Sequence, residues 1–391
     1  MEQMSGELHA ASLLYMRRLM KCLGMLPFGQ NLFSKGFCYV LLFVSLGFSS
    51  YWRFSFDYEF DYDFLNDRFS STIDLSNFVA LVLGHAIIVL ELLWGNCSKD
   101  VDRQLQAIHS QIKLQLGTSN STDRVRRYCN WIYGSLIIRW LIFIVVTIYS
   151  NRALTINATY SELVFLARFS EFTLYCAVIL FIYQELIVGG SNVLDELYRT
   201  RYEMWSIRRL SLQKLAKLQA IHNSLWQAIR CLECYFQLSL ITLLMKFFID
   251  TSALPYWLYL SRVEHTRVAV QHYVATVECI KLLEIVVPCY LCTRCDAMQR
   301  KFLSMFYTVT TDRRSSQLNA ALRSLNLQLS QEKYKFSAGG MVDINTEMLG
   351  KFFFGMISYI VICIQFSINF RAKKMSNEQM SQNITSTSAP I

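Results

Sequence analysis

Three cysteines have a spacing that could bind a soft metal ion. Cys289, Cys292 and Cys295 form a C-x-x-C-x-x-C motif, and residues three apart lie near one face of a helix. A structural zinc site needs a fourth ligand, which the motif lacks. S-acylation beside a membrane surface and packed, unmodified thiols are the other interpretations. The sequence has no Gly-rich phosphate loop, G-x-S-x-G elbow or metal-spaced histidine pair, so we predict neither enzymatic activity nor a cofactor.

Charged residues within apolar segments are a second candidate for chemistry, because each is costly there unless it is paired or hydrated. They are Glu91, Arg139, Arg168, Glu171, Lys246, Glu278, Lys281 and Glu284. Arg168 and Glu171 can pair along one helix face, as can the run from Glu278 to Glu284. The alternative is a water-filled cavity that opens to the outside. Its predicted outer lining is Tyr149, Arg168, Phe169, Phe172, Lys246 and His272, since aromatic walls with a few polar groups are typical of small-molecule pockets.

The last apolar segment carries a stripe that is typical of a narrow pore. Gln365 is an amide deep in an apolar run, so it should face water or a partner instead of lipid. Ser358, Ile362, Gln365 and Phe366 recur at intervals of three and four, which places them on one helix face. Hydroxyl, aliphatic and amide groups on one face suit a gated pore. A single interhelical hydrogen bond is the alternative.

Seven helix-length apolar segments position these residues. The chain has 391 residues, of which 53% are hydrophobic and only 17% are charged, whereas a soluble protein has about 25% charged residues. A transmembrane helix needs about 20 apolar residues. The segments are 36–52, 73–94, 130–150, 163–190, 234–258, 272–292 and 341–370. We therefore predict an all-α polytopic membrane protein with seven transmembrane helices.

Lys and Arg residues are unevenly distributed among the connecting segments. Residues 1–35, 95–129, 191–233 and 293–350 together hold 25 of the 38, and the alternate segments hold 8. Because the richer side is normally cytoplasmic, we predict a cytoplasmic N-terminus and an extracellular C-terminus. The formal net charge of +9 is then a topology signal, and we expect no nucleic-acid partner.

Two sequons agree with this orientation. Asn157 and Asn383 each begin an N-x-T sequence on the predicted outer side and are predicted glycosylation sites. The first predicted outer loop is also acidic, with five Asp and Glu residues between positions 57 and 67. None of the cysteines lies in a predicted outer segment, so we expect no disulfide framework there.

The segments define one membrane domain and no separate soluble domain. The predicted units are a cytoplasmic N-terminal segment at 1–35, a seven-helix domain at 36–370 and a short extracellular tail at 371–391. Leucines recur at helical spacing in the cytoplasmic extensions 191–233 and 293–340, which predicts a helical base below the membrane. Amphipathic helices lying on the inner leaflet are the alternative.

Residues 358–366 read Ser-Tyr-Ile-Val-Ile-Cys-Ile-Gln-Phe. This run resembles the signature of the insect gustatory receptors, which is Thr-Tyr, five hydrophobic residues and Gln-Phe. Ser358 replaces the usual threonine and keeps the hydroxyl. The resemblance implies a tastant-gated, non-selective cation channel that assembles as a homo- or hetero-tetramer with related receptors. It also implies the plasma membrane of chemosensory neurons as the location, with membrane lipid around the protein and monovalent and divalent cations as permeant ions.

The resemblance also implies roles for the residues of the motif. Gln365 and Phe366 would stand at or near the gate, and Ile362 would line the pore one turn earlier. Ser358 and Tyr359 would support that helix. A tastant would bind in an outward-facing cavity among the second to sixth transmembrane helices of each subunit.

Two other classes of membrane protein fit the composition less well. A seven-helix G-protein-coupled receptor is the alternative function, but its extracellular N-terminus would place the Lys- and Arg-rich segments outside the cell. A secondary transporter would show inverted repeats and broken helices at the membrane midplane, and the sequence shows neither.

Overall fold

The computed structural model describes residues 7–29, 31–55, 68–95, 97–116, 122–149, 156–199, 205–263, 268–307, 316–333 and 335–387. These residues are almost entirely helical. In chain order, the elements are α1 (Glu7–Cys22), α2 (Leu32–Ser55), α3 (Arg68–Trp94), α4 (Cys97–Leu116), α5 (Thr122–Tyr149), α6 (Ile156–Arg199), α7 (Trp205–Tyr235), α8 (Gln237–Val263), α9 (Val268–Tyr307), α10 (Ser316–Gln331), β1 (Ser337–Ala338), β2 (Val342–Asp343) and α11 (Thr346–Thr387).

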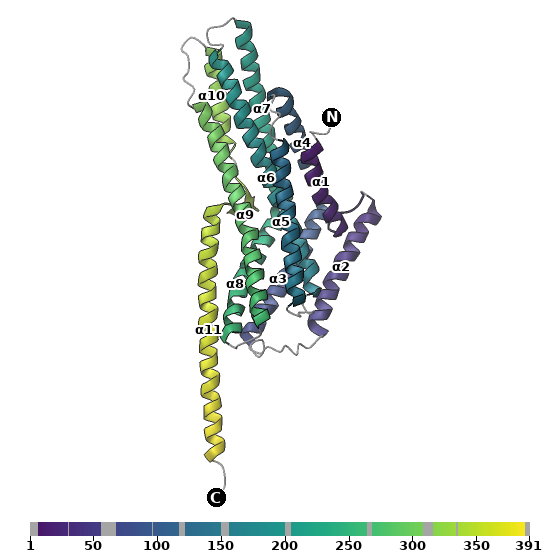
Figure 1. Cartoon of the computed structure of the whole chain (residues 1–391), viewed down its shortest axis with the longest axis vertical. Helices are drawn as coiled ribbons and strands as arrows, with labels where there is room; N and C mark the ends of the chain where they lie inside the picture. The colour runs from purple at the N-terminus through teal and green to yellow at the C-terminus, as the bar shows by residue number, and fades with distance from the viewer. Residues whose placement is uncertain are drawn as a thin grey trace.

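The helices form one elongated bundle around the long helices α6 and α9 (Figure 1). α6 has 44 residues and α9 has 40, so each is about 60 Å long or more at 1.5 Å per residue. A bilayer core is only about 30 Å thick, and both helices therefore extend beyond it. α7 and α10 pack on the extended parts, where Leu218 and Leu325 are fully buried. The leucines predicted to form a helical base thus lie between helices.

Five stretches within the described residues are long and apolar enough to cross a membrane: Leu32–Tyr51, Ser71–Trp94, Thr159–Arg199, Gln237–Val263 and Thr346–Lys373. α5 contains a shorter apolar stretch, Asn130–Val146. The apolar part of α9 carries Glu278, Lys281 and Glu284, which lowers its hydropathy. Every segment predicted to cross the membrane is largely helical, and the count of seven crossings stays a prediction.

The start of the last apolar segment differs from the prediction. Instead of a helical turn at Met341, the chain forms a two-stranded antiparallel hairpin in which Ser337 pairs with Asp343, and α11 begins only at Thr346. Gly339 and Gly340 have φ angles of +58° and +73°, which glycine adopts at little steric cost. The hairpin is the exception to an all-α fold among the described residues.

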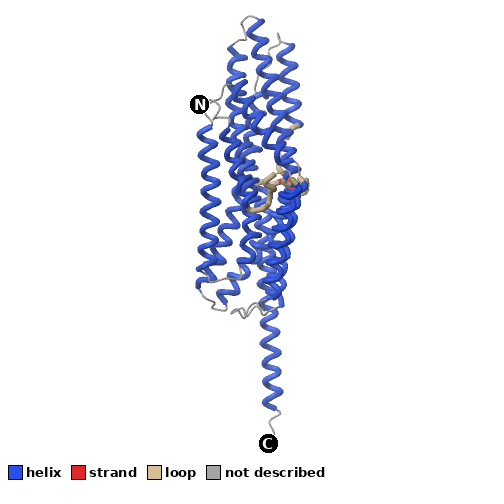
Figure 2. The backbone as a smooth tube through the Cα atoms, turned by 90° about the vertical axis from the view of Figure 1, so that its right-hand side faces the viewer, coloured by secondary structure: helices blue, strands red, loops and turns tan. Residues whose placement is uncertain are grey.

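α11 lies at the side of the bundle and contacts α8 and α9, and its distal half continues past the ends of the other helices (Figures 1 and 2). The residues predicted as a tail continue this helix as far as Thr387. The N-terminal end of the described chain lies in the half of the molecule that holds α7 and α10, and the C-terminal end lies opposite (Figure 1). Asn157 and Asn383 fall within α6 and α11, but their side chains are outside the described part.

Candidate functional site

The residues predicted to line a pore lie on the exposed side of α11. Ile362 is 48% exposed and Phe366 is 59% exposed in the single chain, and Ser358 and Gln365 are exposed as well. Between them, Cys363 is buried against side chains of α3 and α8. α11 therefore packs one edge on the bundle and presents an apolar face with an amide to lipid, water or another chain.

Phe248 of α8 makes two ring contacts with α11. The Phe248 ring lies 5.6 Å from the Phe352 ring and 6.1 Å from the Tyr359 ring, measured between centroids. A Cβ atom at Gly355 would lie 3.5 Å from Phe248 Cε2, which is an ordinary van der Waals distance, so the packing of Phe248 does not require a glycine there. Phe248 thus packs against two residues of α11 that lie about two turns apart, and the second of them belongs to the predicted pore motif.

The first turn of α11 is held firmly by its neighbours. Asn345 Oδ1 accepts a hydrogen bond of 2.7 Å from the Met348 amide, which is an N-cap. The Thr346 amide donates to Thr293 Oγ1 of α9 at 2.9 Å. In the hairpin, the Ser337 amide and hydroxyl both donate to Glu233 of α7 at 3.2 Å. The base of α11 is therefore anchored to α7 and α9.

A cluster of charged side chains joins four helices inside the bundle. Lys246 of α8 contacts Glu162 of α6 at 3.2 Å and donates to Asn77 of α3 at 2.8 Å. Lys281 of α9 contacts the other oxygen of Glu162 at 2.5 Å and Asp250 of α8 at 3.3 Å. Lys246 also pairs with Asp250. Each ammonium thus contacts both carboxylates, and each carboxylate contacts both ammonium groups.

The cluster corrects one predicted pairing. The spacing of Glu278, Lys281 and Glu284 predicted an ion-pair ladder along α9, but Lys281 pairs with Glu162 and Asp250 on two other helices. Helical spacing shows which residues share a face. Here the face of α9 that carries Lys281 is turned towards the carboxylates of α6 and α8.

A small cavity lies beside the cluster, between α5, α6 and α9. Its volume is about 30 Å³, which is room for one water molecule. Its wall includes Arg139, Trp140, Phe143, Glu162, Lys281 and Glu284. Arg139 Nη1 lies 3.9 Å from Glu284 Oε1, which is too far for a hydrogen bond. Arg139 instead donates through Nε to the Ser135 carbonyl of its own helix at 3.1 Å.

Arg168 is the centre of a second buried network. Its guanidinium contacts Glu171 at 2.6 Å and Glu91 at 3.2 Å. It also donates to the Tyr235 carbonyl and the Ser239 hydroxyl and lies over the Tyr235 ring. The predicted Arg168–Glu171 pair is therefore confirmed. Glu91 in turn accepts backbone N–H groups at the start of α8, so the network ties α3 and α6 to that helix end.

The structure does not bring the six predicted ligand residues into one cavity. Lys246 lies in the charged cluster, and the Phe169 ring packs 5.1 Å from the Phe247 ring beside it. Arg168 belongs to the second network, and the buried Phe172 ring packs on Phe236 there. Tyr149 and His272 are exposed, at the C-terminal end of α5 and near the N-terminal end of α9.

Two residues that complete the cluster were missing from the sequence-based site. Glu162 lies just before an apolar run, and Asp250 interrupts another. Their signal was present, since an acidic residue in a membrane segment needs a cationic partner, and Lys246 and Lys281 are two cations in neighbouring segments. The sequence could not show which of them meet.

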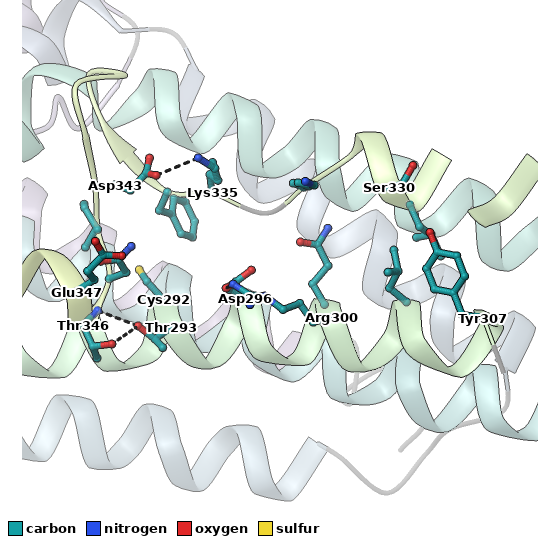
Figure 3. Close-up of a pocket in the computed structure, with 17 residues that line it drawn as sticks. Cys292, Thr293, Asp296, Arg300, Tyr307, Ser330, Lys335, Asp343, Thr346 and Glu347 are labelled. Atoms are coloured by element: carbon teal, nitrogen blue, oxygen red, sulfur yellow. Dashed lines mark hydrogen bonds and ion pairs between the residues drawn. The ribbon is translucent and has the colours of Figure 1, made fainter. Parts of the chain in front are cut away.

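A larger cavity of about 850 Å³ lies between α9, α10, the hairpin and the start of α11. Figure 3 shows Lys335 and Asp343 paired across one side of it, at 3.1 Å, and Thr293 bonded to Thr346 on another. Cys292 reaches its wall (Figure 3).

The C-x-x-C-x-x-C motif forms packed thiols in the bundle. Cys289, Cys292 and Cys295 are all buried, and Cys292 Sγ lies 3.6 Å from Cys176 Sγ of α6. No group of three potential metal ligands occurs among the described residues. The packed-thiol interpretation therefore fits the structure best.

The fold and these residues can now be compared with known proteins. A profile of the 7tm chemosensory receptor family matches residues 13–370. The chain belongs to this family. The gustatory receptor 98b of Drosophila melanogaster is 24% identical over 213 residues. That alignment covers 52% of each protein, so the chain spans about half the length of this relative. The predicted resemblance of the chain to the insect chemoreceptors is thus confirmed.

Solved structures of one olfactory receptor share the fold. The insect olfactory receptor OR5 of Machilis hrabei in complex with eugenol aligns with a TM-score of 0.65 and 12% identity. The structure of the same receptor described without eugenol gives a TM-score of 0.63 and 11% identity. Both alignments cover 90% of this chain and 99% of the receptor. The chain therefore has the fold of an insect chemoreceptor over nearly its whole length.

Proposed function

We propose that this chemoreceptor is one subunit of a tetrameric, tastant-gated, non-selective cation channel in the plasma membrane, and that α11 lines the pore. The observation that carries the proposal is the exposed stripe of Ile362, Gln365 and Phe366 on a membrane-length helix that packs on the bundle along another edge. Four such helices around an axis form a conduit with an aliphatic constriction next to an amide ring, which suits gating by dewetting.

The proposed topology has seven crossings, made by α2, α3, α5, α6, α8, α9 and α11. The N-terminus is cytoplasmic and the C-terminus is extracellular. The distribution of Lys and Arg supports this orientation, as does the position of the two described ends in opposite halves of the molecule. The extended ends of α6 and α9, with α7 and α10, form the cytoplasmic base.

The proposed tastant site is the cavity between α5, α6 and α9, next to the charged cluster. α8 provides a mechanical link from this site to the pore. Lys246 and Asp250 lie on its cluster side, and Phe248, midway between them, points to the opposite side and packs on α11. A ligand that binds more tightly to one position of α8 stabilises that position, and with it the position of α11 that packs against Phe248. The eugenol complex of the olfactory receptor supports a small organic ligand.

The pore proposal can be tested without knowing the ligand. Serine is smaller and more polar than isoleucine, so Ile362→Ser widens the constriction and lets water enter it. This variant should therefore give a cation current in the absence of tastant. Ile357→Ser is the matched control, because Ile357 is also half exposed but lies about 140° around the helix from Ile362. Gln365→Ala should change ion selectivity with normal surface expression. A silent Ile362→Ser variant that reaches the surface, or an equal current from Ile357→Ser, would contradict the proposal.

A further inference from the structure

Two cysteines on neighbouring long helices bring their sulfur atoms into contact. Cys176 of α6 and Cys292 of α9 are both reduced, and their Sγ atoms lie 3.6 Å apart. A disulfide bond is about 2.05 Å long, so the two atoms would have to approach each other by about 1.5 Å. α6 and α9 already pack on each other in the bundle. The two thiols are therefore placed for a disulfide bond between these helices.

Cys292 is also the thiol of this pair that a small molecule can reach. Its residue is only 2% exposed, but it lies in the wall of the cavity of about 850 Å³ between α9, α10 and the hairpin (Figure 3). The side chains of Arg300 and Lys335 line the same cavity and are largely exposed, so the cavity is open to solvent. Cys176 is fully buried and is not part of the wall. A reagent that enters from solvent thus meets Cys292 first.

The other two cysteines of the C-x-x-C-x-x-C motif are placed differently. Cys289 and Cys295 are buried, and neither of them belongs to the wall of the cavity. The Cys295 thiol donates to the backbone carbonyl of Cys176 at 3.5 Å, so it is directed at the main chain of α6. Of the three cysteines in the motif, Cys292 therefore combines contact with a second sulfur atom and access from the cavity.

We propose that Cys292 and Cys176 form a modification site for hydroperoxides, at which oxidation joins α9 to α6 by a disulfide bond. In the first step the peroxide O–O bond breaks and one oxygen atom is transferred to Cys292 Sγ. The sulfur is oxidised to a sulfenic acid, and the peroxide is reduced to an alcohol or to water. In the second step Cys176 Sγ attacks Cys292 Sγ, and the hydroxyl group leaves with the Cys176 proton as water.

Burial controls the rates of oxidation and reduction at this site. Reactive thiols are normally accessible and lie in an electropositive environment, so the first step at Cys292 should be slow. The second step is intramolecular and is favoured by the contact between the two sulfur atoms. Reduction of the disulfide requires attack on one of its sulfur atoms by another thiol, and its rate depends on access. The site should therefore respond to sustained exposure to peroxide, and the disulfide should persist.

The disulfide would lie beside the anchor of α11. Thr293, the residue after Cys292, accepts a hydrogen bond of 2.9 Å from the amide of Thr346 in the first turn of α11. On α6, Tyr175 precedes Cys176 and donates to Asp102 of α4 at 2.6 Å. The cross-link would therefore fix the anchor of α11 relative to α6 and α4. An effect on the pore rests on the proposed role of α11, whereas the oxidation itself does not.

The test treats the purified full chain with hydrogen peroxide, at a concentration raised until the exposed Cys279 is oxidised. The remaining thiols are blocked with N-ethylmaleimide, and cross-linked peptides are identified by mass spectrometry without reduction. We expect a peptide pair joined through Cys176 and Cys292. The melting temperature should rise by roughly 2 to 5 °C, because a disulfide that closes a long loop stabilises the folded state. Prolonged treatment with dithiothreitol should reverse both changes.

Three variants identify the residues that take part. Cys176→Ala and Cys292→Ala should each abolish the cross-link and the peroxide-dependent rise in melting temperature. Each variant is compared with and without peroxide, so a change in its basal stability does not affect the result. Cys295→Ala is the matched control from the same motif and should keep both effects.

Three results would overturn the proposal. They are oxidation of Cys279 without a link between Cys176 and Cys292, a link that contains Cys295 in place of Cys292, and a rise in melting temperature that survives in Cys176→Ala. None of these measurements uses a tastant or a current. Failure of the channel proposal is therefore distinguishable from failure of this one.

Discussion

Substitution of Arg168 tests whether this residue belongs to a structural network or to a ligand site. Its side chain is fully buried and contacts Glu171 at 2.6 Å and Glu91 at 3.2 Å. Arg168→Met keeps much of the side-chain volume but leaves both carboxylates without their cation. Removing one partner of a buried ion pair costs about 3–5 kcal/mol, which is a large part of a typical folding free energy of about 5–15 kcal/mol. We therefore expect this variant to be strongly destabilised.

The assay is thermal melting of the detergent-purified chain, together with the fraction of protein that reaches the cell surface. Arg300→Met is the control, because it removes an exposed arginine that pairs with Asp296 on the same helix, and exposed pairs of this kind contribute little. Arg168→Met should melt at a much lower temperature than the wild type, and Arg300→Met should match the wild type.

A second substitution shows how much of the lost stability comes from the unpaired carboxylates and how much from the lost packing of Arg168. Adding Glu171→Gln to Arg168→Met removes one of the two stranded charges and keeps an acceptor for the Tyr235 hydroxyl, which donates to Glu171 at 2.9 Å. The double variant should therefore recover part of the lost stability. A variant Arg168→Met that is as stable as the wild type but no longer responds to tastant would refute this reasoning and make Arg168 a ligand residue, as the sequence alone predicted.

Three further substitutions, one of them with a control variant, test the parts that position α11. Phe248→Ala should lower the maximal tastant current while the melting shift caused by ligand persists, because it removes the ring contacts between α8 and α11; an unchanged current would argue against α8 as the link. Gly339→Val should lower the melting temperature, because it places a β-branched residue at a φ of +58° and its Cβ would lie 2.5 Å from Ile241 Cδ1. Gly350→Ala is its control: a Cβ atom at Gly350 meets open space, so this variant should be neutral or stabilising. Asn345→Ala should cost about 1 kcal/mol through loss of the N-cap, and normal melting would show that the cap is dispensable.

Much of the helical framework could be predicted from the sequence, because apolar runs of helix length are a strong local signal. The helices at 73–94 and 163–190 correspond to α3 and the apolar part of α6. The Arg168–Glu171 pair was also predictable, since its spacing of three lies within one helix. The hairpin before α11 was not recognised, although two successive glycines at Gly339 and Gly340 are a turn signal.

The charged cluster could not be predicted, because it depends on how the helices are rotated against one another. Spacing along α9 placed Lys281 with Glu278 and Glu284, but its partners Glu162 and Asp250 are more than 30 residues away in sequence. Phe172 and Arg168 similarly lie on a face of α6 that meets Tyr235 and Phe236. These pairings depend on tertiary packing, which the sequence of one helix does not encode by itself.

The most direct test of the account is whether Gln365 faces the ion pathway. Gln365→Cys is placed in the Ile362→Ser background and exposed to a charged, water-soluble thiol reagent while the current is recorded. We predict rapid, lasting block of the current. The same treatment should have little effect on Ile364→Cys, whose position packs against the side chains of α8, and on the Ile362→Ser background alone. A current that persists after the Gln365→Cys thiol is shown to be modified, or equal block at position 364, would contradict the claim that this face of α11 lines the pore.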